Sequence, residues 1–299
     1  MKDRQFGRVR FIRGENGGKY PFSHSLYLQG DRERVVIDPA SSLEKLTRLK
    51  EEGVDGVWLS HWHEDHIRYM NLFEGCPVWV SERDFPPFTD LETFLDWYGI
   101  EDRGARYYWK KEMLETFDYR PRQTACFLQD DKRMDLGGLT VQVIPTPGHT
   151  PGHLSFFFPE EELLFLGDYD LTSFGPWYGD ILSDIAHTIA SIHKLKAIPA
   201  RRWVAAHNHG IYESNPGPLW DQYEKIIYER ERKLLAFLDR PKTPREICSA
   251  WLIYGRPREP KEMYEFNERV LIGKHLDYLR QRGKAVLEDG RWRKVESEI

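Results

Sequence analysis

A run of seven residues, SHWHEDH at positions 60–66, constrains the fold of this chain more than any other feature. It places three histidines and an aspartate directly after an apolar run that reads as a β-strand. Neutral imidazole nitrogens and carboxylate oxygens are the ligands that divalent zinc, iron and manganese prefer. His61 and His63 lie two positions apart on an extended backbone and can reach one ion, whereas Asp65 and His66 follow where the chain turns and can face a second. The run therefore predicts a metal centre at the end of a strand.

Two further groups of potential ligands follow other strand-like runs. Glycine and proline stiffen the loop PGHTPGH at positions 147–153, and His149 from this loop is enough to complete a set of three imidazoles with His61 and His63. We expect His153 to support the loop through hydrogen bonds instead. Asp168 ends the apolar run ELLFLGD, where a carboxylate is costly to bury unless it is paired or binds metal. Its two oxygens are suited to bridging two ions.

The last ligand comes from the run AAHNHG at positions 205–210. One histidine from this run is enough to join Asp65 and His66 around the second ion. His207 follows the preceding strand directly, whereas His209 stands before a glycine in a turn. The sequence therefore favours His207, with His209 as the alternative.

The expected elements place each group of ligands at the end of a strand. The run 42–52 predicts a helix that ends at Gly53 and leads into a strand at 56–60, a βαβ step whose sites form at the carboxyl ends of strands. A second helix is expected over 180–198, and a mostly helical insertion over 84–125 that covers an edge of the core or shapes a substrate pocket. The segment FGPWY at 174–178 is expected to line that pocket or to form a packed turn. Strands are expected at 8–12, 25–29, 34–38, 140–144, 154–158, 162–168 and 202–206.

Taken together, the motifs HWHEDH, PGHTPGH, FLGD and AAHNHG, in this order and each after a strand, resemble the metallo-β-lactamase superfamily of hydrolases over about residues 20–215. The resemblance implies an α/β fold, a four-layer αββα sandwich, for a catalytic domain over 1–220, with the site at one edge. The bulky run Ile67-Arg68-Tyr69 replaces the small glycines that commonly follow the first motif. The resemblance also implies two ligand sets joined by a bridging carboxylate: His61, His63 and His149 for one ion, Asp65, His66 and His207 for the other, and Asp168 between them.

The tail of the chain carries a second resemblance. The run TPREICSAWLIYG, a predicted helix over 261–282 and the run KAVLEDGRWRKV look like a small, mainly helical winged-helix module over 221–299, with Asp289-Gly290 as the turn of the wing hairpin. Such modules often bind nucleic acid, but Glu262, Glu265 and Glu268 dilute the basic residues of this one. A role in packing or in a homodimer is at least as well supported.

Composition limits where the protein acts and what it binds. The net charge of −5 argues against a protein that coats nucleic acid, and no apolar run is long enough to span a membrane. The N-terminal sequence has no secretory h-region, and three widely spaced cysteines, Cys76, Cys126 and Cys248, suit a reducing compartment, so we expect a cytoplasmic protein. The many aromatic residues are typical of binding pockets as well as cores.

The leading hypothesis is a dinuclear metal hydrolase in which a hydroxide that bridges two divalent ions attacks a small ester, thioester or lactone. Zinc is the expected metal, with iron or manganese as alternatives, and Asp65 is the expected acid and base as well as a ligand. The second hypothesis is a phosphodiesterase or ribonuclease that acts on RNA or a nucleotide. The third is a non-hydrolytic enzyme with one or two irons. A metal-stabilised regulator that binds DNA through its tail, and a true β-lactamase, are disfavoured.

Overall fold

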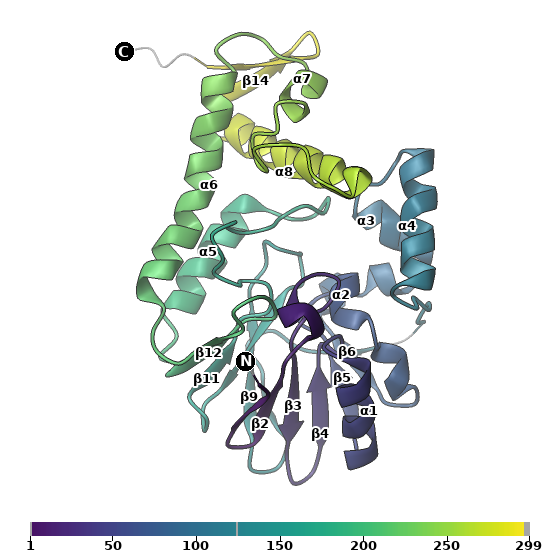
Figure 1. Cartoon of the computed structure of the whole chain (residues 1–299). Helices are drawn as coiled ribbons and strands as arrows, with labels where there is room; N and C mark the ends of the chain where they lie inside the picture. The colour runs from purple at the N-terminus through teal and green to yellow at the C-terminus, as the bar shows by residue number, and fades with distance from the viewer. Residues whose placement is uncertain (1, 124, 296–299) are drawn as a thin grey trace.

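Two large β-sheets lie in the lower half of the molecule as seen in Figure 1, with the C-terminal helices above them. The computed structural model describes residues 2–123 and 125–295. The seven strands of the first sheet lie in sequence order: β1 (Arg4–Phe6), β2 (Val9–Ile12), β3 (Ser25–Gln29), β4 (Arg34–Ile37), β5 (Gly56–Trp58), β6 (Val78–Val80) and β7 (Cys126–Phe127). The six strands of the second sheet lie in the order β13 (Ile211–Tyr212), β12 (Arg202–Val204), β11 (Leu163–Phe165), β10 (Leu154–Phe158), β9 (Thr140–Pro145) and β8 (Arg133–Asp135). Pairing is antiparallel from β1 to β4 and parallel from β4 to β7, so the first sheet is mixed.

Alternate residues of the strands fill two different cores. In β3, Leu26 and Leu28 belong to the same core cluster as Phe156 of the second sheet, whereas Tyr27 on the opposite face belongs to the cluster that includes the helices. In β11, Leu163 packs between the sheets and its neighbour Leu164 packs with helices on the outer side. This period of two, with both faces apolar, is what a strand covered on both sides requires. The strands therefore form the two inner layers of an α/β sandwich.

Helices cover the outer faces of both sheets. On the first sheet these are α1 (Leu43–Glu52), α2 (Glu64–Ile67), α3 (Leu91–Trp97) and α4 (Arg103–Glu115), with short 3-10 turns at η1 (Glu15–Gly18), η2 (Met70–Phe73), η3 (Glu82–Asp84) and η4 (Pro86–Phe88). On the second sheet they are α5 (Ile185–Lys196) and α6 (Gly217–Phe237). Phe94 of α3 and Met113 of α4 are fully buried, so the mostly helical insertion covers an edge of the core, which is one of the two roles expected for it.

The helix expected over 180–198 begins later than its apolar pattern indicates. The Asp184 side chain accepts a hydrogen bond from the backbone N–H of His187, and this cap sets the helix start at Ile185. Ile181 therefore lies outside the helix and is half exposed, although it continues the same apolar spacing. The preceding residues form a loop that becomes important at the metal centre.

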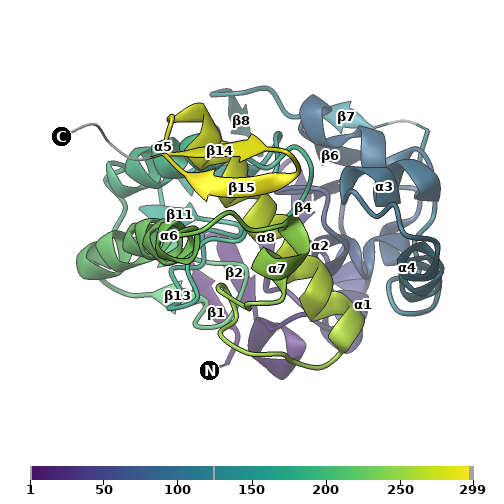
Figure 2. The same cartoon turned by 90° about the horizontal axis from the view of Figure 1, so that it is seen from above.

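The C-terminal part continues from α6 into α7 (Pro244–Cys248), α8 (Lys261–Gln281) and the hairpin of β14 (Ala285–Glu288) and β15 (Arg291–Lys294). The hairpin turns at Asp289 and Gly290, where the sequence predicts it. Seen from above, α8 crosses over the molecule from the side of α6 toward α4 (Figure 2). The predicted domain boundary at residue 220 falls inside α6, whose Trp220 and Tyr223 pack with α5. Both this boundary and the winged-helix assignment stay predictions. No helix in the described ranges is long and apolar enough to cross a bilayer.

Candidate metal centre

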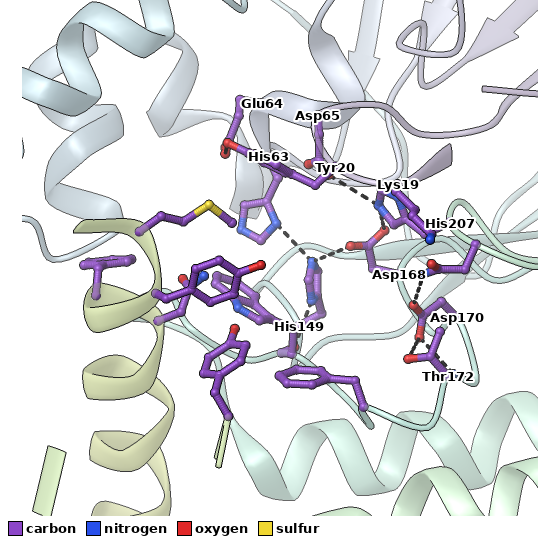
Figure 3. A pocket seen from close by; sticks show the side chains of 18 of the residues that line it. Lys19, Tyr20, His63, Glu64, Asp65, His149, Asp168, Asp170, Thr172 and His207 are labelled. Atoms are coloured by element: carbon purple, nitrogen blue, oxygen red, sulfur yellow. Dashed lines mark hydrogen bonds and ion pairs between the residues drawn. The ribbon is translucent and has the colours of Figure 1, made fainter. Parts of the chain in front are cut away.

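The predicted ligands come together at one edge of the two sheets, because each follows the carboxyl end of a strand. His61 and His63 follow β5, His149 follows β9, Asp168 follows β11 and His207 follows β12. Asp65 and His66 lie in the short helix α2, which begins directly after His63 and turns both side chains toward the same edge. Figure 3 shows His63, His149, Asp168, Asp65 and His207 facing one another around a pocket.

The first set consists of three imidazoles that point their nitrogens at a common point. His61 Nε2 and His63 Nδ1 are 3.0 Å apart, and His149 Nε2 lies 3.2 Å from the former and 3.0 Å from the latter. Asp168 Oδ2 is 3.2 Å from His149 Nε2. These four side chains form one cluster whose ligand atoms all lie within 4.8 Å of one another.

The second set lies beside the first and shares Asp168 with it. His66 Nε2 and His207 Nε2 are 3.2 Å apart, and Asp65 Oδ2 is 3.5 Å from His207 Nε2. Asp168 Oδ1 lies 2.9 Å from His66 Nε2 and 3.3 Å from His207 Nε2, while its Oδ2 faces the first set. One carboxylate therefore presents one oxygen to each set, which is the geometry of a bridging ligand.

The chemistry of the donors fits divalent cations. A neutral imidazole carries a single N–H, so three ring nitrogens packed this closely cannot satisfy one another by hydrogen bonds alone. Burial lowers the pKa of His63 to about 3 and that of His149 to about 4, so both rings are neutral at pH 7 and have a free lone pair. Burial also opposes protonation of His207, but the Asp168 carboxylate outweighs it and raises the pKa of His207 to about 9. The second set thus attracts positive charge, and the residues present suit one ion in each set.

Three of the histidines are held by partners of the ring nitrogen that faces away from the ligand sets. His66 Nδ1 lies 2.9 Å from a carboxylate oxygen of Asp38, which also accepts hydrogen bonds from the backbone N–H and the hydroxyl of Ser60. His207 Nδ1 is 2.6 Å from the carbonyl of Gly18, and His149 Nδ1 is 2.9 Å from the carbonyl of Trp177. Such partners fix the tautomer and the orientation of metal-ligating histidines. Sequence reasoning missed Asp38, although its position at the end of a buried strand is the same signal that identified Asp168.

The remaining histidines of these loops, His153 and His209, do not join the ligand sets. His153 is buried, with Nδ1 2.8 Å from the hydroxyl of Thr146, and its Nε2 accepts a hydrogen bond from the backbone N–H of Asp168. It supports the loop, as expected. His209 is exposed and its ring lies against Tyr212, whereas His207 is nearly buried with its Nε2 in the second set. The structure therefore brings His207, and not His209, to the other ligands.

A cavity of about 380 Å³ opens directly over both sets. The insertion contributes Tyr98 and Trp109 to its walls, and the 174–178 segment contributes Phe174 and Trp177. The C-terminal part, which the sequence did not connect with the site, also supplies lining residues, namely Tyr254, Arg258, Met263, Tyr264, Phe266 and Asn267. No signal in a single sequence indicates this contribution, because it depends on how α8 crosses the edge of the sheets.

Glu64 is a buried carboxyl in the pocket wall that the sequence analysis did not assign. Its two oxygens accept hydrogen bonds from the hydroxyls of Tyr20 at 3.1 Å and Tyr98 at 2.6 Å. Burial, together with the charge of Asp65, raises the pKa of Glu64 to about 7. It joins the N-terminal loop and the insertion to the helix that carries the second set of ligands.

The family model of the metallo-beta-lactamase superfamily matches residues 20–207. The chain therefore belongs to this superfamily of hydrolases, and the membership predicted from its motifs is confirmed. The αββα arrangement of sheets and helices agrees with it. The likeness to named hydrolases supports the predicted class of enzyme, a metal-dependent hydrolase.

Three curated relatives illustrate the breadth of that class. A probable metallo-hydrolase from Streptococcus pyogenes is 29% identical over 167 residues, which cover 54% of this chain and 63% of the relative. A hydroxyacylglutathione hydrolase from Haemophilus influenzae is 28% identical over 151 residues, 48% of this chain and 64% of the relative. An atrochrysone carboxyl ACP thioesterase from Pseudocercospora fijiensis is 23% identical over 266 residues, 84% of this chain and 68% of the relative. The matches thus span between 63% and 68% of the length of these relatives.

Two solved structures share the fold over nearly the whole chain. A metallo-beta-lactamase family protein from Thermus thermophilus has a TM-score of 0.72 at 23% identity and covers 96% of this chain and 99% of its own. A beta-lactamase domain protein from Burkholderia ambifaria has a TM-score of 0.74 at 17% identity and covers 98% and 94%. Because both matches extend over almost all residues, the likeness in fold includes the C-terminal helices.

Proposed function

We propose that this protein is a dinuclear metal-dependent hydrolase whose substrate is a small ester, thioester or lactone. The observation that carries the proposal is that members of both ligand sets line one cavity of about 380 Å³, together with aromatic side chains such as Trp109, Trp177 and Phe266. A cavity of this size and lining accommodates a small molecule with apolar surface. The relatives named as a thioesterase and as a hydroxyacylglutathione hydrolase support acyl substrates.

The residues divide the work of such a reaction among them. When bound, two divalent ions, for which zinc is our first choice, supply a Lewis acid and activate water for attack near neutral pH. Asp168 holds the two sets together, because each of its oxygens faces a different set. Asp65 lines the cavity beside His207, and we assign it the transfer of the proton released from water. Trp177 and Tyr98 exclude bulk water from the reacting groups.

A phosphodiesterase is the second candidate, and the charges of the cavity disfavour it. Apart from the proposed metal ligands, the acidic and basic side chains in the described lining of the cavity are Glu64, Asp170, Lys19 and Arg258. Binding of a nucleic acid strand relies on neutralising many phosphates with lysine and arginine. Two cationic side chains in the cavity and a net charge of −5 for the chain are poorly suited to such a partner. A non-hydrolytic iron enzyme would use the same ligands, and metal analysis of the purified protein separates it from the hydrolase.

The test compares acyl with phosphoryl substrates, and it compares the activities of two histidine variants. The full chain loaded with zinc is assayed with acyl thioesters, lactones and phosphodiesters, and His61→Ala is compared with His187→Ala, an exposed histidine on α5. We expect hydrolysis of a thioester or lactone that His61→Ala removes and His187→Ala preserves. Turnover of phosphodiesters alone, or a rate that His61→Ala leaves unchanged, would overturn the proposal.

A further inference from the structure

A loop formed by residues 174–183 separates the first ligand set from the C-terminal helices and contacts both. On the inner side, the carbonyl of Trp177 lies 2.9 Å from His149 Nδ1, and the hydroxyl of Ser183 donates a hydrogen bond of 2.7 Å to the carbonyl of His149. The buried carboxylate of Asp180 lies 3.6 Å from His63 Nε2, the nitrogen that faces away from the other ligands. The loop thus holds His149 through its ring and its backbone, and it places a carboxylate beside His63.

On its outer side the loop is held by a buried arginine of α6. Arg230 is 4% exposed, and its Nη1 donates hydrogen bonds to the carbonyl of Pro176 at 2.7 Å and to the hydroxyl of Tyr178 at 2.8 Å. Its Nη2 donates to the carbonyl of Phe174 at 2.6 Å, and the guanidinium lies over the ring of that residue. The hydroxyl of Tyr178 in turn lies at hydrogen-bond distance, 2.8 Å, from Nε2 of His275 on α8. Burying a cation is costly unless its donors are satisfied, and here the loop supplies the acceptors.

A lysine of α8 holds the other end of the same loop. Lys274 Nζ donates hydrogen bonds of 2.8 Å to the carbonyl of Ile181 and of 2.8 Å to the carbonyl of Ser183. Ser183 is the residue whose hydroxyl contacts the backbone of His149. The lysine is therefore two hydrogen bonds away from a proposed metal ligand, although it belongs to the C-terminal part of the chain.

We propose that Arg230 and Lys274 are positioning residues of the first metal site, and that the C-terminal helices form part of this site by fixing the 174–183 loop. The inference rests on the ligand sets of the proposed function. It assigns the C-terminal part a task inside the molecule, in addition to the pocket residues that it contributes. Removing a residue that orients a metal ligand without contacting the metal typically lowers the metal affinity about 10-fold to 100-fold.

The test measures zinc affinity rather than activity. The full chain and its variants are stripped of metal and titrated with zinc against a chromophoric chelator, which resolves the two binding constants. We expect Arg230→Met to weaken one constant about 10-fold or more and to leave the other within about twofold. Arg230→Lys keeps the charge but loses the planar fork, so it should give an intermediate loss. Lys274→Met should weaken the same constant.

The matched control is Arg282→Met. Arg282 pairs with Glu231 between the end of α8 and α6, at 3.2 Å, and none of the hydrogen bonds described for Arg282 reaches the 174–183 loop. A merely structural role of the C-terminal cations would lower the melting temperature in all variants and leave both zinc constants unchanged, which would overturn the proposal. If Arg230→Met does not fold, Arg230→Lys and Lys274→Met decide the matter. Wild-type protein that binds no zinc would refute the ligand sets themselves, whereas zinc binding without acyl hydrolysis would refute only the proposed activity.

Discussion

Replacing Gly167 by alanine should destabilise the protein by much more than the same change at another glycine with positive φ. Gly167 has φ of +57°, and a Cβ added there would lie 2.4 Å from Nε2 of His153. That ring cannot withdraw, because it is fully buried, lies against Thr146 on one side and accepts the N–H of Asp168 on the other. The substitution must therefore displace the ring or the backbone that carries the bridging carboxylate.

Gly255 is the matched control, because its φ is +75° and no atom lies within 4 Å of an added Cβ. Both substitutions share the backbone cost of a left-handed alanine, about 1–2 kcal/mol. They also share the loss of unfolded-state freedom that accompanies any change from glycine to alanine. Only Gly167→Ala adds the overpacking term, about 1–3 kcal/mol, and weakens a buried hydrogen bond worth about 1 kcal/mol.

The difference between the two variants should therefore be about 2 kcal/mol or more in the free energy of unfolding. For a chain of this size it corresponds to a melting temperature about 3 °C or more lower for Gly167→Ala than for Gly255→Ala. Thermal unfolding of both variants in metal-free form, followed by circular dichroism, measures it. Equal losses in the two variants would refute the reasoning that ties this glycine to His153.

Three more outcomes follow from the same geometry. His207→Ala should reduce bound zinc from two ions per chain to one, whereas His209→Ala should keep two, as measured by metal analysis after dialysis; equal losses would reopen the assignment. Removal of zinc with a chelator should lower the melting temperature, since a ligand at a hundredfold excess over its Kd stabilises the folded state by about 2.7 kcal/mol. Burial raises the pKa of Asp84 to about 8, so the native state keeps a proton that the unfolded chain releases near pH 4. The Asp84 carboxyl therefore lowers the free energy of unfolding as the pH rises from about 4 to about 8. The Asp84→Asn variant should show a smaller fall in the free energy of unfolding than the wild type over this range, as measured by denaturant titrations at each pH.

The sequence predicted those parts of the fold and the site that depend on local patterns. The strands that carry the ligands appear where apolar runs end in histidine or aspartate, and His61, His63, His149 and Asp168 meet because parallel and neighbouring strands end at one edge. The apolar spacing alone puts the start of α5 too early, since Ile181 repeats that spacing while the cap at Asp184 decides where the helix begins.

The pocket and the supports of the ligands were beyond a single sequence. Phe266 and Tyr264 are brought over the metal centre by the packing of α8 across the sandwich, about 200 residues after the first motif. Arg230 and Lys274 resemble the ordinary surface charges of amphipathic helices in the sequence, because most of their acceptors are backbone carbonyls, which carry no sequence signal. Such contacts depend on tertiary packing alone.

The most direct test of the account is a zinc titration of the metal-free chain in which bound zinc and the rate of thioester hydrolysis are measured in the same samples. The two ligand sets predict two zinc ions per chain, with hydrolysis rising only as the second ion binds. Full hydrolysis by a chain that holds one ion or none would contradict the account.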